Sequence, residues 1–221
     1  MTVRGGGEFG LVWRSAPEAA RRALALAHEA LTAGGLAVGA VLTDPAGAVL
    51  AEGRNEAYEA GPGTGPLRGT PLAHAEMNAL GAARTEWSLA ATTLWSTHEP
   101  CAMCAAAAEF TGVGEVRYLA PDPWALAGGA AGASGAVLSG AGDGVWLIAA
   151  NVMFLRSVRV AAPGPAEPEI LVRHRALEPE TAALHDAVPP GLPGAGPVRD
   201  WLAGLWPELA RAARARAARV G

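Results

Sequence analysis

Lysine is absent from the 221 residues, and all 17 basic side chains are arginine. The chain therefore cannot form a lysine Schiff base and has no P-loop lysine, which excludes both kinds of mechanism. Acidic side chains outnumber basic ones by 21 to 17, so the net charge is −4. Because proteins that bind nucleic acids usually present a basic surface, this balance argues against a nucleic-acid partner.

Long hydrophobic runs are also missing. A membrane-spanning helix needs roughly 20 consecutive apolar residues, and no segment of this chain provides them. The N-terminal stretch MTVRGGGEFGLVW lacks an apolar core of signal-peptide length. We therefore expect no membrane span and a cytoplasmic protein.

Cysteine is limited to two residues, Cys101 and Cys104. In a reducing compartment, a pair spaced as C-x-x-C binds a metal or exchanges electrons more often than it forms a structural disulfide. The pair therefore predicts either a metal site or a dithiol redox site.

Apolar periodicity and turn residues predict an α/β fold in the first half of the chain. Ser15 is a candidate N-cap for the first helix, and Thr70-Pro71 resemble the start of the second. The last two strands need a crossover helix between them if they pair in parallel. The expected elements are helix 15–33, strands 36–43 and 48–53, helix 70–84, strand 91–97, helix 101–111 and strand 114–120.

The second half is expected to be mainly helical. Apolar residues at helical spacing predict a helix over 145–159 that faces the core. The Gly-, Ala- and Ser-rich segment 128–144 is typical of a mobile loop, and segment 188–197 of a stiff linker. A final helix is expected from residue 200, bent at Pro207.

Two short stretches, LAHAEMNAL (72–80) and STHEPCAMCAAA (96–107), carry metal-type ligands. His74, Cys101 and Cys104 provide the three protein ligands that a catalytic zinc ion takes. The two cysteines, spaced i and i+3, leave one face of a helix. The pattern predicts a Zn²⁺ site.

Glu76 lies two residues after His74, and this spacing limits where in a helix the two side chains can share a site. In the middle of a helix the two side chains would diverge, so they converge only on a site beyond the N-terminus of their helix. There Glu76 is a carboxylate beside the metal that is not needed as a fourth ligand. Such a group moves protons, and we predict that Glu76 is the catalytic residue.

His-Ala-Glu, followed after 23 residues by Pro-Cys-Ala-Met-Cys, resembles the signature of zinc deaminases that act on nucleobases. The stretches GTPLAHAEMNAL and LWSTHEPCAMCAAAAEFTGVGEVRYLAPD are most similar to one branch of the cytidine deaminase-like superfamily. That branch contains tRNA adenosine, guanine and cytosine deaminases. The resemblance covers about residues 15 to 122.

The resemblance implies a cytidine deaminase-like three-layer α/β/α sandwich with a mixed five-stranded sheet and a C-terminal helical extension. We expect residues 1–160 to form the zinc-dependent deaminase domain and residues 161–221 to pack on it as the extension. Members of the family are usually oligomeric. Together with the apolar faces expected at 145–159 and 200–210, this favours a homodimer.

The resemblance also implies substrate contacts. The family uses the asparagine that ends a Gly-x-Asn element, and Asn55 matches it here. Ala75, Pro100 and Cys101 are expected to line the base. His98 and Glu109 depart from the residue types usual in the branch. Either could touch the substrate, but the preferred interpretation of each is a partly exposed side chain.

The sequence thus favours a zinc-dependent hydrolytic deaminase that removes an exocyclic amine from a nucleobase or nucleoside and releases ammonia. Three alternatives stay open: a tRNA-editing adenosine deaminase, a C-x-x-C dithiol redox protein and a non-catalytic zinc-binding domain. Charge favours a small-molecule base or nucleoside over tRNA or a nucleotide. Segment 59–69 has only Arg68 against Glu59, and segment 85–116 has no arginine.

Overall fold

The computed structural model describes residues 4–59, 65–122, 136–137, 144–189, 191–194 and 196–221. The strands are β1 (Gly39–Thr43), β2 (Val49–Arg54), β3 (Thr93–His98), β4 (Glu115–Ala120) and β5 (Ala136–Val137). The helices are α1 (Arg4–Ser15), α2 (Glu18–Thr32), α3 (Ala75–Gly81), α4 (Ala102–Phe110), α6 (Val145–Ala161), α7 (Glu169–Leu177), α8 (Pro179–Ala187), α9 (Val198–Gly204) and α10 (Trp206–Val220).

The strands form one mixed sheet in the order β2-β1-β3-β4-β5. Strand β1 is antiparallel to β2, as the predicted hairpin requires, and also to β3, whereas β4 is parallel to both β3 and β5. The predicted mixed α/β fold is confirmed. The predicted five strands are matched only in part, because four strands have five or six residues and β5 has two. Segment 128–144 is rich in residues of low strand propensity, which agrees with so short a pairing.

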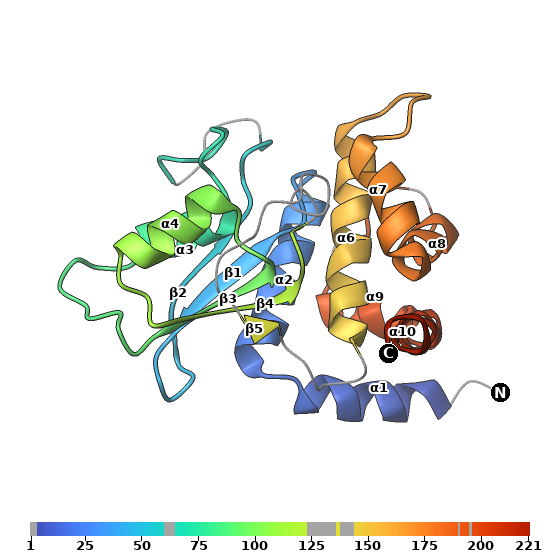
Figure 1. Cartoon of the computed structure of the whole chain (residues 1–221), viewed down its shortest axis with the longest axis horizontal. Helices are drawn as coiled ribbons and strands as arrows, with labels where there is room; N and C mark the ends of the chain where they lie inside the picture. The colour runs from blue at the N-terminus through green and yellow to red at the C-terminus, as the bar shows by residue number, and fades with distance from the viewer. Residues whose placement is uncertain (1–3, 60–64, 123–135, 138–143, 190, 195) are drawn as a thin grey trace.

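Helices cover both faces of the sheet, with α3 and α4 on one side and α2 and α6 on the other (Figure 1). Successive residues of a strand point to opposite faces, so each strand contributes to two cores. Val41 and Trp95 belong to the core shared with α2 and α6, and Leu42 and Leu94 to the core shared with α3 and α4. The sheet is therefore buried between two helical layers.

Helix α6 confirms the helix expected at 145–159, and it is buried from Val145 to Ser157. It lies between the sheet and the helices α7, α8 and α10, which cover its outer side (Figure 1). Leu202 and Leu209 of the C-terminal helices are buried in the same core. The apolar faces that favoured a homodimer are thus covered within one chain, and the homodimer stays a prediction without their support. The domain boundary at residue 160 also stays a prediction.

Helix α1 was not expected, because its glycine-rich start disfavours a helix. Two buried aromatic residues one helical turn apart hold it in place. The ring of Phe9 lies 5.4 Å from that of Trp206, and the ring of Trp13 lies 5.5 Å from that of Trp146. Ser15 ends this helix and donates its hydroxyl hydrogen bond to the Val12 carbonyl, so its predicted role as the cap of α2 is wrong.

Two other helix boundaries differ from expectation. The helix expected from Thr70 begins at Ala75, because the Thr70 hydroxyl donates to the Leu67 carbonyl in a turn instead of capping a helix. The C-terminal helix is two helices, α9 and α10, with Pro207 in the first turn of the second. The predicted loop 128–144 lies mostly outside the described residues, and linker 188–197 lies partly outside them.

None of the helices in the described part of the chain combines the length and the apolar character that crossing a membrane requires.

Gly53 is the position where α3 lies against β2. A Cβ atom there would lie 2.6 Å from the Ala79 backbone nitrogen and would also meet the Ala75 carbonyl oxygen. Because these are backbone atoms, we expect Gly53→Ala to displace α3 and to lower the free energy of unfolding by about 1–3 kcal/mol. Gly81→Ala is the matched control, since no atom lies within 4 Å of its Cβ position. Equal stability of the two variants in urea denaturation would contradict this packing.

Candidate functional site

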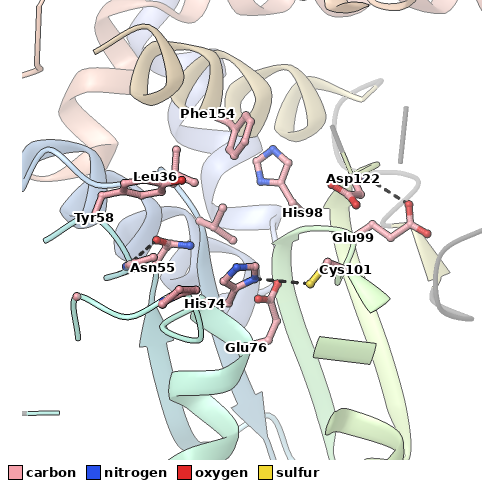
Figure 2. Close-up of a pocket in the computed structure, with 14 residues that line it drawn as sticks. Leu36, Asn55, Tyr58, His74, Glu76, His98, Glu99, Cys101, Asp122 and Phe154 are labelled. Carbon is pink, nitrogen blue, oxygen red and sulfur yellow. Dashed lines mark hydrogen bonds between the residues drawn. The ribbon is translucent and has the colours of Figure 1, made fainter. Parts of the chain in front are cut away.

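The predicted ligands come from the starts of two helices. His74 is the N-cap of α3 and Cys101 the N-cap of α4, and both have extended backbones with ψ of 155° and 168°. Cys104 follows in the first turn of α4. The extended cap residues project their side chains beyond the helix ends toward each other (Figure 2). The predicted convergence at helix N-termini is thus present, although α3 begins later than expected.

The three ligand atoms form a nearly equilateral triangle. His74 Nδ1 lies 3.6 Å from each sulfur atom, and the Cys101 and Cys104 sulfurs lie 3.6 Å apart. A tetrahedral zinc ion with Zn–S of about 2.3 Å and Zn–N of about 2.0 Å separates its ligands by about 3.5–3.8 Å. Both cysteines are free. The triangle therefore fits zinc and leaves the fourth position open.

Among the described residues, this is the one group of three or more metal-type side chains whose ligand atoms all lie within 4.8 Å of one another. Hydrogen bonds from Cys104 and then His74 lower the pKa of Cys101. The hydrogen bond to Cys101 raises the pKa of His74. The cluster thus shares protons that a divalent ion would displace on binding.

Glu76 lies beside this triangle without belonging to it (Figure 2). Its side chain is 4% exposed, and burial raises its pKa. The Ser96 hydroxyl donates a 2.7 Å hydrogen bond to Glu76 Oε1 and opposes that rise. A buried carboxyl group with a raised pKa is suited to proton transfer near neutral pH.

A cavity of about 390 Å³ opens over these groups, and four of the predicted site residues line it: Asn55, His74, Glu76 and Cys101. Cys104 lies behind them and is fully buried. Ala75 and Pro100 are buried and do not line the cavity. Ala75 packs in the core between α3 and the sheet, and the substrate contacts of Ala75 and Pro100 stay predictions.

Asn55 follows the last residue of β2 and is 3% exposed. Its Oδ1 atom accepts a 3.1 Å hydrogen bond from the Ala57 backbone N–H. This bond directs the amide nitrogen toward the cavity (Figure 2). The side chain therefore offers a fixed hydrogen-bond donor to a ligand.

His98 was expected to be partly exposed, and this is wrong, because it is 3% exposed and lines the cavity. Its Nε2 atom lies 3.3 Å from Asn151 Oδ1, and its ring lies 4.9 Å from that of Phe154. Both partners belong to α6, whose position over the end of β3 the sequence did not predict. Glu109, in contrast, is exposed on α4 and does not line the cavity.

Several cavity residues were missed by the sequence analysis. Phe154 was assigned to an ordinary core helix, yet it closes the upper wall in Figure 2. The available signal was Asn151, a polar residue inside an otherwise apolar stretch. Glu99 and Asp122 line the opposite side, and the Asp122 N–H donates a 3.3 Å hydrogen bond to Glu99. Together with Glu76 they make the described lining acidic, and it contains no arginine.

Comparison with known proteins places residues 14–120 in a family described as the cytidine and deoxycytidylate deaminase zinc-binding region. A tRNA-specific adenosine deaminase from Haemophilus influenzae is 41% identical over 90 residues, which are 39% of this chain and 47% of that protein. The chain spans less than half the length of the curated relatives that it matches.

Two solved structures are also similar to parts of this chain. The guanine deaminase of Bacillus subtilis is 32% identical over 50% of this chain and 68% of its own, with a TM-score of 0.41. A protein solved in complex with 2,6-diaminopurine is 22% identical, covers 70% of this chain and 86% of its own, and has a TM-score of 0.50, which supports the fold. Through residues 14–120, the chain belongs to the cytidine deaminase-like superfamily of zinc deaminases.

The burial of His98 predicts a pH dependence of stability. Burial lowers the pKa of His98 to about 3, below the value of about 6.5 in an unfolded chain. The folded state therefore binds fewer protons than the unfolded state between these values, and stability falls as the pH falls below about 6.5. A variant without His98 lacks the part of this acid-induced loss of stability that His98 causes.

We expect His98→Leu to lose stability less steeply than the wild type between pH 6.5 and 4.5, by up to about 1.4 kcal/mol per pH unit. Urea denaturation of the zinc-loaded proteins measures this difference. Phe154→Leu is the control, because it changes the packing on the same ring without removing a titratable group. Identical slopes for His98→Leu and the wild type would contradict the assignment of His98 as a neutral buried group.

Proposed function

We propose that this protein is a zinc-dependent hydrolytic deaminase that removes the exocyclic amine of a free nucleobase or nucleoside. One observation carries the proposal. Three zinc-type ligands spaced 3.6 Å apart lie beside a buried carboxylate outside the ligand set, at the base of a cavity. Neither a dithiol redox site nor a structural zinc site requires a buried carboxylate for proton transfer.

The roles of the residues follow from their positions. His74, Cys101 and Cys104 would hold a zinc ion, which would supply Lewis acidity that lowers the pKa of water at the site to about 7. Glu76 accepts a proton from the attacking water and delivers it to the ring nitrogen next to the amine-bearing carbon. Glu76 then takes the proton of the hydroxyl group now attached to the ring carbon and passes it to the amine, which leaves as ammonia. The raised pKa of Glu76 suits a group that must both accept and donate the proton.

The cavity wall supplies the binding groups. The amide nitrogen of Asn55 donates to an acceptor on the base, and the backbone at Cys101, which lines the cavity, contacts the reacting edge of the base. Leu36 and Phe154 give the cavity apolar surface for the flat ring. A volume of about 390 Å³ is near the small end of the range of about 300–1,000 Å³ for ligand cavities. This size suits a base or a nucleoside.

Charge supports a substrate without phosphate groups. Glu76, Glu99 and Asp122 line the cavity and would repel an anion. Arg54 and Arg68, which adjoin the cavity residues Asn55 and Gly69 in the sequence, are engaged, because both form ion pairs with the buried Glu59.

Two of the four arginines of the C-terminal helix α10 are engaged elsewhere. Arg216 and Arg219 of α10 form ion pairs with Glu178 and Glu180, 2.5 Å and 2.7 Å long. These arginines are therefore occupied at the edge of α8 instead of covering the cavity. Their pairing weakens the idea that the C-terminal segment grips tRNA phosphates.

A tRNA-editing adenosine deaminase is the second candidate. The 41% identity to a tRNA-specific adenosine deaminase over 90 residues favours it. The described cavity lining does not offer the positive charge that holding a tRNA backbone requires.

Glu76→Gln should keep zinc and the fold but lower kcat by about 10²–10⁴-fold, because an amide cannot carry the proton. Metal analysis, thermal unfolding and ammonia release measure the three properties. Glu109→Gln is the matched control, since Glu109 is an exposed glutamate outside the cavity, and it should keep wild-type turnover. Normal turnover of Glu76→Gln, or loss of its zinc, would show that the assigned role is wrong.

The substrate proposal is tested by ammonia release from free bases, nucleosides, mononucleotides and an anticodon stem-loop at matched concentrations. We expect turnover of a base or nucleoside and weaker use of its phosphorylated form, with little dependence on salt. A clear preference for the stem-loop that falls steeply with salt would instead identify a tRNA-editing enzyme. No ammonia from any compound would count against the deaminase itself.

A further inference from the structure

Ser96 is a polar residue on the face of β3 that points toward α3. Leu94 on the same face packs with Leu42 and Leu80 in the core beneath α3. Ser96 is 1% exposed, so its hydroxyl has no access to solvent. A buried hydroxyl is costly unless it is hydrogen-bonded, and the identity of its partners therefore indicates its purpose.

The hydrogen bonds of Ser96 fix the direction of its single proton. Ser96 Oγ accepts a 3.3 Å hydrogen bond from the His98 backbone N–H and donates a 2.7 Å hydrogen bond to Glu76 Oε1. Because a hydroxyl has only one hydrogen, the acceptor role toward His98 leaves that hydrogen for Glu76. The bond to Glu76 is the shorter of the two and joins two buried groups.

Ser96 is also held on a rigid element. It lies in the central strand, paired with Ala40 of β1 on one side and with Tyr118 of β4 on the other. Glu76 lies in the first turn of α3, and the backbone of this helix packs directly against Gly53 of β2. The hydrogen bond therefore connects a donor on a fixed strand to the Glu76 carboxylate.

We propose that Ser96 is a positioning residue that holds one oxygen of the Glu76 carboxylate, so that the other oxygen faces the metal site and the substrate. The inference rests on the proposed function, because positioning matters only if Glu76 transfers protons. A purely structural role is the competing explanation, in which Ser96 only satisfies a buried carboxyl group. The two explanations differ in what the loss of the hydroxyl does to kcat.

The test compares Ser96→Ala and Ser96→Thr with Thr92→Val, which removes another buried hydroxyl that bonds only to the Leu89 carbonyl. We expect Ser96→Ala to keep zinc and to lower kcat by about 10- to 100-fold with KM nearly unchanged, as a lost hydrogen bond to a charged group predicts. Ser96→Thr should restore most of the turnover. Thr92→Val should have wild-type kcat.

A double-mutant cycle with Glu76→Gln shows whether Ser96 acts through Glu76. In the Glu76→Gln background, Ser96→Ala should lower the residual kcat by less than about twofold. An equal loss in both backgrounds, or an unchanged kcat for Ser96→Ala alone, would overturn the proposal.

A crystal structure of zinc-loaded Ser96→Ala gives a readout that does not need turnover. We expect the Glu76 carboxylate to adopt a changed or second orientation, and an unmoved carboxylate would overturn the positioning role. Failure of the wild type to release ammonia would refute the proposed function, whereas this structure would still decide whether Ser96 orients Glu76.

Discussion

The close packing of α3 on β2 is the constraint on which the site depends. Gly53 has no side chain, so the backbone of α3 can lie directly against the strand. This places His74 and Glu76 at the end of the sheet where β3 leads into Cys101. A few tenths of an ångström matter here, because a three-ligand zinc site tolerates little variation in its ligand separations.

The candidate metal-site residues were more predictable from the sequence than the arrangement of the helices. The ligands and the adjacent carboxylate could be predicted because the i, i+2 and i, i+3 spacings have few geometric solutions at a helix start. The hairpin and α6 were predictable from local turns and periodicity. Helix α1 was not, since only the long-range contacts of Phe9 and Trp13 stabilise its glycine-rich start.

The wall of the cavity that α6 forms could not be predicted from the sequence. His98 was expected to be partly exposed, because nothing local shows that α6 covers the end of β3. Asn151 and Phe154 are 53 and 56 positions further along the chain, and they bury His98 through tertiary contacts alone. The family match ends at residue 120, so this wall is built by a part of the chain outside it. The residues proposed to hold the metal thus lie within the family segment, while α6 supplies part of the surface that a base would meet.

The central claim is that His74, Cys101 and Cys104 hold one zinc ion with a fourth position open beside Glu76. Zinc X-ray absorption spectroscopy of the purified protein tests this claim most directly. The account predicts one zinc per chain with two sulfur neighbours at about 2.3 Å and two nitrogen or oxygen neighbours at about 2.0 Å. Protein without zinc that contains a Cys101–Cys104 disulfide, or a zinc shell without sulfur, would contradict it.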